Sequence, residues 1–221
     1  MSIDPSFNKK IHHITHYSNL IKIIQQNNLY SGNILQTRNI IPTNIGYTTL
    51  KQNRACHCVD IRPTTTINDY VPFFFTTRPP MMIAIAKGSV TEYQGTQREI
   101  IYLVSSIGKI IDAECSWCFT DGHAIEALTG YYENLEQLTE IDWDAIRDWD
   151  YRTTANDPDK PRRKQAEFLV HECVPWTCIE SITVMDLEMR KCVQEILSNS
   201  QHIPRINIDR NWYYNPRRCQ E

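Results

Sequence analysis

The sequence is poor in glycine and has no long apolar run, and each shortage excludes a class of function. With seven glycines in 221 residues it contains no Walker or GxGxxG loop, so bound phosphates must be held in another way. No stretch is long enough to span a bilayer, and the N-terminus lacks the apolar core of a signal peptide. We expect a soluble, cytoplasmic protein without membrane contact.

Positive charge is also scarce. The formal net charge is −3, which provides no long-range field for capturing nucleic acid. A nucleic-acid substrate would therefore need a short, locally basic footprint. Arg162, Arg163 and Lys164 form one such patch, although a solvated charged surface is the commoner explanation for a patch of this kind.

Eight cysteines are too few to make a chain of this length a disulfide scaffold, so we expect mostly reduced thiols. The spacings Cys56-x-Cys58 and Cys115-x-x-Cys118 could supply four zinc ligands. However, the second pair encloses Trp117 and has no glycine nearby, unlike a zinc knuckle. We therefore predict no metal, and keep a non-enzymatic, zinc-stapled nucleic-acid-binding module as the alternative from another class.

The length and ordinary composition favour one domain over residues 1–221, and helices mixed with strands without regular βαβ alternation favour an α+β fold. Residues 33–69 look like a long functional loop with one helical turn near 48–53. Helical spacing, alternation and short apolar or aromatic runs predict the other elements. Helices are expected from Tyr17 through Ile24, over 134–149 and after Asp186, and strands over 70–76, 100–104, 164–170 and 179–185.

The segment KQAEFLV carries the strongest chemical signal. In a strand, Phe168 and Val170 face one way, while Gln165 and Glu167 face the other. A carboxylate that projects from a core strand can stabilise the positive charge that develops on a sugar ring and can hold a ribose hydroxyl. The other interpretation is a strand with a polar, solvent-facing side.

The segment IHHITH places three histidines within five residues at the expected start of a helix. His12 and His16 have helical spacing, but no glutamate follows as in HExxH, so a zinc protease has little support. One histidine and the neighbouring backbone could instead grip a nucleotide ribose or amide. Surface histidines at a helix start explain the pattern equally well.

Seven segments, in order along nearly the whole chain, resemble the DarT family of single-stranded DNA thymidine ADP-ribosyltransferases. They are HHITHYSNLIKII, NDYVPFFFTTRPPM, EYQGTQREIIYLVSS, CFTDGHA, LTEIDWDAI, RRKQAEFLV and INIDRNWYY. The resemblance implies an ADP-ribosyltransferase fold, with a split central, mostly antiparallel β-sheet flanked by helices. NAD would bind as co-substrate in a cleft at the split.

The resemblance also implies roles for individual residues. Glu167 would be the catalytic glutamate, at the end of a substrate loop and catalytic strand over about 119–167. Arg54 matches an essential arginine on an NAD-binding element over about 38–56, where it would neutralise the pyrophosphate and help to remove the thymine N3 proton. Because arginine is a very weak acid, that second role is chemically demanding.

Further positions match segments that bind NAD or DNA in the family. The match assigns His13, Ile14 and Thr15 to the nicotinamide and its ribose, and Arg78, Met81 and His123 to the DNA. Phe74 stands where the family usually has a tyrosine, so a hydroxyl contact is lost.

The activity implied is transfer of ADP-ribose from NAD to thymine N3 in single-stranded DNA, which would block replication. The family implies a toxin, with a role in phage defence, and a macrodomain antitoxin of the DarG type as its partner. The same fold could instead modify guanine in DNA or a base in RNA, because the acceptor contacts lie in divergent segments.

Overall fold

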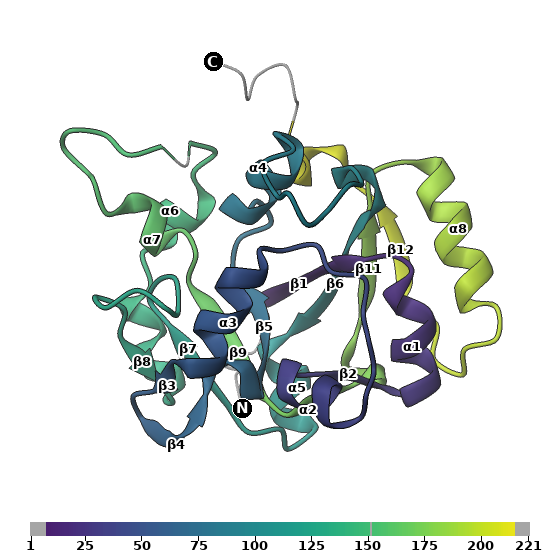
Figure 1. Cartoon of the computed structure of the whole chain (residues 1–221), viewed down its shortest axis with the longest axis horizontal. Coiled ribbons are helices and arrows are strands. Elements are labelled where there is room, and N and C mark those ends of the chain that lie inside the picture. The colour runs from purple at the N-terminus through teal and green to yellow at the C-terminus, as the bar shows by residue number, and fades with distance from the viewer. Residues whose placement is uncertain (1–7, 151, 215–221) are drawn as a thin grey trace.

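The structure is a computed structural model that describes residues 8–150 and 152–214. Its centre is an eight-stranded sheet with the order β12-β11-β6-β1-β5-β9-β7-β8 (Figure 1). Its strands are β1 (Lys10–His16), β5 (Tyr70–Phe74), β6 (Ile100–Ser106), β7 (Trp117–Thr120), β8 (Tyr131–Tyr132), β9 (Glu167–His171), β11 (Ser181–Val184) and β12 (Arg205–Ile208). Strands β11 and β12 run parallel, and the other neighbouring pairs are antiparallel.

The sheet is split between β1 and β5. Strand β1 pairs with β6 along its whole length, from Lys10 to His16, whereas its pairing with β5 in the described chain is the single pair His12 and Phe74. Backbone groups of the two strands beyond that pair are available to other partners. The split, mostly antiparallel sheet expected from the sequence is confirmed.

The histidines of IHHITH lie on β1, so their placement at the start of a helix was wrong. Ile11 and Ile14 pack into different hydrophobic clusters, as residues on opposite faces of a strand do. Two neighbouring strands offer hydrogen bonds to this segment, and the interior of the sheet buries it. Tertiary pairing therefore outweighs the helical spacing of His12 and His16.

The other strands follow the sequence patterns closely. All seven residues of β6 are buried, as expected for a central strand. Ile101 and Leu103 enter the cluster on one face of the sheet, and Tyr102 and Val104 enter the cluster on the other. The strand predicted over 179–185 is observed as β11.

Helices cover both faces of the sheet (Figure 1). Helices α1 (Asn19–Gln26), α5 (Ile107–Asp112) and α8 (Leu187–Leu197) contribute to the larger cluster, and α4 (Pro80–Ala86) covers the opposite face. The helix expected after Asp186 is confirmed as α8. The Asp186 side chain caps it by accepting hydrogen bonds from the backbone N–H groups of Glu188 and Met189. The helix expected near Leu20 is confirmed as α1.

The segment 33–69, expected to be a long loop, consists largely of short helices and strands. It contains α2 (Gly32–Thr37), α3 (Thr48–Cys56), the hairpin of β3 (Cys58–Val59) and β4 (Arg62–Thr66), and a 3₁₀ turn at Ile67–Asp69. Neither α2 nor α3 buries a residue. Their sequences therefore lack the apolar stripe by which a helix is recognised.

The segment 134–149 is two short helical pieces rather than one helix. A 3₁₀ helix spans Leu135–Glu140, and α6 spans Trp143–Arg147 with Asp142 as its N-cap. The remaining elements are α7 (Lys160–Arg163), the small sheet of β2 (Asn28–Tyr30) with β10 (Cys173–Pro175), and 3₁₀ turns at Gln97–Glu99, Trp176–Cys178 and Arg210–Trp212. No helix in the described ranges is long and apolar enough to cross a membrane.

Candidate active site

Glu167 is the first residue of β9 and pairs with Phe74 on β5, beside the split in the sheet. It is 1% exposed, so the interpretation of a polar, solvent-facing strand is wrong. Phe168 and Val170 enter the large core, as expected, and Leu169 enters the cluster on the opposite face. Gln165 precedes the strand, yet it lines the same cavity as Glu167.

The Glu167 carboxylate forms a buried ion pair with Arg54 of α3. Nη1 of Arg54 lies 3.0 Å from Oε2 and donates a hydrogen bond of 3.2 Å to Oε1. The side chain of Arg54 is 14% exposed. A buried carboxylate is strongly disfavoured unless a cation and hydrogen bonds compensate it, so this pairing keeps a negative charge at the floor of the cavity.

The end of β7 and the segment that follows it also hold Glu167. The backbone N–H of Ala124 donates to Oε1 of Glu167 at 3.1 Å, and the backbone N–H of Glu167 donates to the Thr120 hydroxyl at 3.1 Å. Tyr131 donates its hydroxyl proton to the carbonyl of Ala124 at 2.6 Å. Sequence reasoning missed Thr120, Ala124 and Tyr131, although the first two lie in the CFTDGHA motif.

A cavity of about 280 Å³ opens above the ion pair, lined by β1, α1, α3, β5 and the segment 40–47. The structure brings seven of the eight predicted site residues to its wall. These are His13, Ile14, Thr15, Arg54, Met81, His123 and Glu167. Arg78 does not line it.

The segment 40–47 is attached to the floor through Asn19, which sequence reasoning also missed. The Asn19 side chain donates to the Thr15 hydroxyl and to the Thr43 carbonyl, both at 3.0 Å, and accepts from the Thr43 backbone N–H at 2.8 Å. Asn19 is the first residue of α1 and is buried. A buried amide that makes three hydrogen bonds fixes this wall of the cavity.

Two adjacent histidines bridge the split in the sheet. Nδ1 of His12 lies 3.1 Å from the Phe74 carbonyl, and Nδ1 of His13 lies 2.8 Å from the Pro72 carbonyl. Because a carbonyl only accepts, we assign the proton to each Nδ1, which leaves Nε2 of His13 as an acceptor. Burial lowers the pKa of both rings to about 4, so both are neutral at pH 7.

These two histidines predict that the protein loses stability in mild acid. Their folded pKa values of about 4 lie below the ordinary histidine pKa of 6.5, so the unfolded state takes up protons first as the pH falls. Each histidine should cost about 2 kcal/mol of unfolding free energy between pH 7.5 and 5. Urea titrations at the two pH values measure this. His13→Gln should remove about half of the effect, and an unchanged urea midpoint at pH 5 would contradict the assignment.

The predicted basic patch is internally neutralised. Arg162 forms ion pairs with Asp121 at 3.1 Å and with Asp159 at 2.8 Å, and Arg163 is paired with acidic neighbours in the same way. Lys164 is fully buried. The patch therefore fastens α7 to its surroundings, and it offers little free positive charge to a polyanion.

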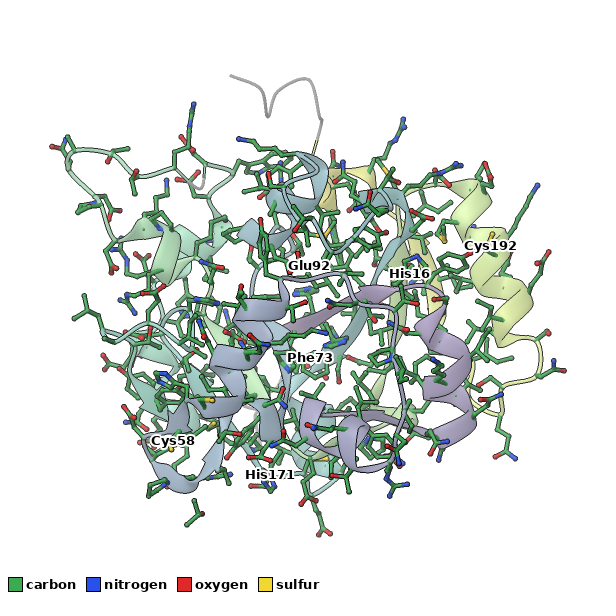
Figure 2. All side chains as sticks on the ribbon, in the orientation of Figure 1. His16, Cys58, Phe73, Glu92, His171 and Cys192 are labelled. Atoms are coloured by element: carbon green, nitrogen blue, oxygen red, sulfur yellow. The ribbon has the colours of Figure 1, made fainter. Side chains whose placement is uncertain are left out.

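The cysteines of the zinc alternative are dispersed. Cys56 and Cys58 are exposed, whereas Cys118 is buried beside Leu169. In Figure 2, Cys58 lies at the edge of the molecule. Across the described chain, no three or more His, Cys, Asp or Glu side chains are gathered as a possible metal site.

Three buried side-chain atoms in the described residues lack a hydrogen-bond partner, and all belong to residues predicted to bind or act on substrate. They are Nη2 of Arg54, Oε2 of Glu167 and Nε of Arg78. Buried polar groups are nearly always paired in proteins. Arg54 and Glu167 form an ion pair in the cavity, yet each keeps a buried polar atom without a hydrogen bond. This is typical of a site that completes its hydrogen bonds with a ligand.

Comparison with known proteins matches this chain to a described family. A family model described as DarT, ssDNA thymidine ADP-ribosyltransferase, matches residues 12–214. A DNA ADP-ribosyl transferase of Thermus aquaticus is 39% identical over 215 residues, which cover 95% of this chain and 90% of that protein. One of Escherichia coli O127:H6 is 33% identical over 202 residues and covers 91% of each.

Solved structures agree with the sequence relatives. Thermus sp. 2.9 DarT in complex with ADP-ribosylated ssDNA matches with a TM-score of 0.85 at 34% identity, over 93% of this chain and 96% of that one. The same protein in complex with NAD+ matches with a TM-score of 0.81 at 33% identity, over 96% and 100%. The α+β fold expected from the resemblance is therefore confirmed.

Proposed function

The chain belongs to the DarT family of single-stranded DNA thymidine ADP-ribosyltransferases, and from this membership we propose that it transfers ADP-ribose from NAD to N3 of a thymine in single-stranded DNA. The observation that carries this proposal is the buried ion pair of Arg54 and Glu167 at the floor of the cavity, in which each residue keeps one polar atom without a hydrogen bond. A neutral cavity would not suit a cationic intermediate.

In the proposed reaction, the bond between nicotinamide and C1 of the ribose breaks, and its electron pair leaves with nicotinamide. The ribosyl cation that results lies beside the Glu167 carboxylate, which stabilises it. Thymine N3 then bonds to C1, and the N3 proton is released. Arg54 pairs with Glu167 through Nη1 and offers Nη2 to a phosphate oxygen, the bond for which a guanidinium is well suited.

The wall of the cavity supplies the contacts that hold NAD. We assign the nicotinamide and its ribose to His13, Ile14 and Thr15, with Nε2 of His13 accepting a hydrogen bond from an amide or hydroxyl group. Met81 and His123 lie at the same cavity and are assigned to the thymine. Burial lowers the pKa of His123, which favours the neutral ring beside an uncharged base.

We expect the purified protein to add one ADP-ribose to a single-stranded oligonucleotide that contains one thymine. A duplex of the same sequence should react at least about tenfold more slowly, because extracting a paired base costs a few kcal/mol. Mass spectrometry of the oligonucleotide after incubation with NAD measures both. An oligonucleotide with N3-methylthymine is the matched control and should stay unmodified.

Other outcomes of that experiment would redirect the proposal. An adduct on thymine-free DNA would identify guanine as the acceptor, and an adduct on RNA alone would identify an RNA base. Stoichiometric zinc together with no consumption of NAD would favour the non-enzymatic, zinc-stapled module. An adduct on N3-methylthymine would overturn the assignment to N3.

We extend the proposal to a toxin that acts in the cytoplasm and blocks replication by modifying template strands, with a role in phage defence. A macrodomain antitoxin of the DarG type would remove the modification or hold the enzyme inactive. Family membership supports this part of the proposal. Growth arrest on expression, lifted when Glu167 is replaced, tests the toxin role.

A further inference from the structure

An exposed tryptophan stands over Arg78, outside the cavity. The guanidinium carbon of Arg78 lies 4.3 Å from the centre of the Trp149 ring and 4.2 Å from the centre of the Tyr214 ring. Tyr214 is 4% exposed and Trp149 is 63% exposed. The cation therefore lies between one buried ring and one ring that faces solvent.

The inner ring is fixed by the C-terminal motif that the sequence singled out. The Tyr214 hydroxyl donates to the Arg78 carbonyl at 3.0 Å, and the Tyr214 backbone N–H donates to the side-chain oxygen of Gln97 at 2.9 Å. Arg78 also donates its backbone N–H to the Thr76 hydroxyl at 3.1 Å. The backbone of Arg78 and the ring of Tyr214 are therefore fixed relative to each other before any ligand arrives.

Hydrogen bonds fix the backbone that leads to Trp149. Buried Lys164 donates hydrogen bonds to the carbonyls of Ala145, Ile146 and Asp148, and the last of these directly precedes Trp149. Burial lowers the pKa of Lys164 to about 8. The acidic neighbours are paired, Asp148 with Lys160 at 2.5 Å and Asp150 with Arg152 at 3.0 Å, so little free negative charge would repel a polyanion.

The two rings and the cation lie on the chain segments that build the active site. In the sequence, Arg78 lies between Phe74, which pairs with Glu167 in the sheet, and Met81, which lines the cavity. Lys164 precedes Glu167 by three residues, a distance of at most about 11 Å of extended chain. Figure 1 shows α6 and α7 together at the end of the sheet formed by β7, β8 and β9. A base close to the modified one would come within reach of Trp149.

We propose that the outer face of Trp149 is a stacking platform for a base that neighbours the modified thymine, and this rests on the proposed function. Arg78 covers one face of the indole, and the exposure of the residue leaves the other open. A base stacked there would add one more ring to the contacts of Tyr214 with Arg78 and of Arg78 with Trp149. Nε of Arg78, buried without a partner in the described residues, and the rest of its guanidinium place a cation next to the bound strand.

The test is a cycle that combines Trp149→Ala with oligonucleotides lacking one base next to the single thymine, one position at a time. Because stacking on an aromatic ring is worth about 1–3 kcal/mol per base, Trp149→Ala should raise the KM for the oligonucleotide about tenfold. The kcat and the KM for NAD should stay within about twofold. Trp149→Phe should recover most of the loss, and Leu187→Ala, equally exposed on α8, should change nothing.

The cycle separates stacking from a general disturbance. At one position, removing the base should cost the wild type about the same factor and cost Trp149→Ala almost nothing. Penalties that multiply at every position, or a Trp149→Ala enzyme with wild-type KM, would overturn the platform. Binding of the labelled oligonucleotides, followed by fluorescence anisotropy, gives the same cycle without turnover. A stacking signal without any adduct would reject the proposed reaction and keep the platform.

Discussion

Replacing Glu167 by glutamine should reduce ADP-ribosylation of DNA by on the order of a thousandfold, because one preorganised group at a developing charge contributes about a hundred- to a thousandfold. Glutamine keeps the volume of the side chain and can still accept from the Ala124 N–H, but it carries no negative charge to stabilise a ribosyl cation. The dissociation constant for NAD should change less than about tenfold, since the lost interaction is strongest in the transition state.

Initial rates of adduct formation and calorimetric titration of NAD measure the two quantities separately. Glu195→Gln, on the exposed surface of α8, is the matched control and should retain full activity. Cells that stop growing when they express the wild type should tolerate Glu167→Gln. A variant that keeps more than about a tenth of the wild-type rate would remove Glu167 from the chemical step.

The elements that could be predicted from the sequence are those that bury many apolar residues. β6 was recognised as a short, continuous apolar run and α8 by apolar residues at helical spacing, and both elements bury those residues. The environment of β9 was predicted only in part, because alternation placed Glu167 opposite Phe168 but could not say whether it faced water or a cavity. Resemblance to a family, rather than periodicity, pointed to Arg54 and His13.

Other features depend on contacts between distant residues, which local patterns do not contain. Arg54 and Glu167 are 113 residues apart in sequence, and the ion pair exists because α3 lies over the end of β9. The strand carrying His12 was mistaken for a helix start because its stability comes from pairing with β6. Ala124 acts through its backbone N–H, so its side chain gives no signal of its role.

Replacing Arg54 by alanine should destabilise the fold as well as abolish activity. The substitution leaves the Glu167 carboxylate buried with the Ala124 N–H but without its cation, a change that typically costs 3–5 kcal/mol. For a protein of this size, that corresponds to a fall in melting temperature of about 10 °C. Thermal unfolding followed by circular dichroism measures the shift. Arg98→Ala, which breaks ion pairs that are about two-fifths exposed on the arginine side, is the control and should change the melting temperature little, because exposed ion pairs contribute little to stability.

The double variant Arg54→Met with Glu167→Gln separates stability from catalysis. It removes both buried charges together, and replacing a whole buried ion pair by neutral groups of similar volume is often neutral or stabilising. We expect the melting temperature to return to within a few degrees of the wild type while no adduct forms. If the double variant were as unstable as Arg54→Ala, Arg54 would hold α3 by packing rather than by compensating the Glu167 charge. Full recovery with no activity would mean that the pair is kept for the reaction, at no benefit to the fold.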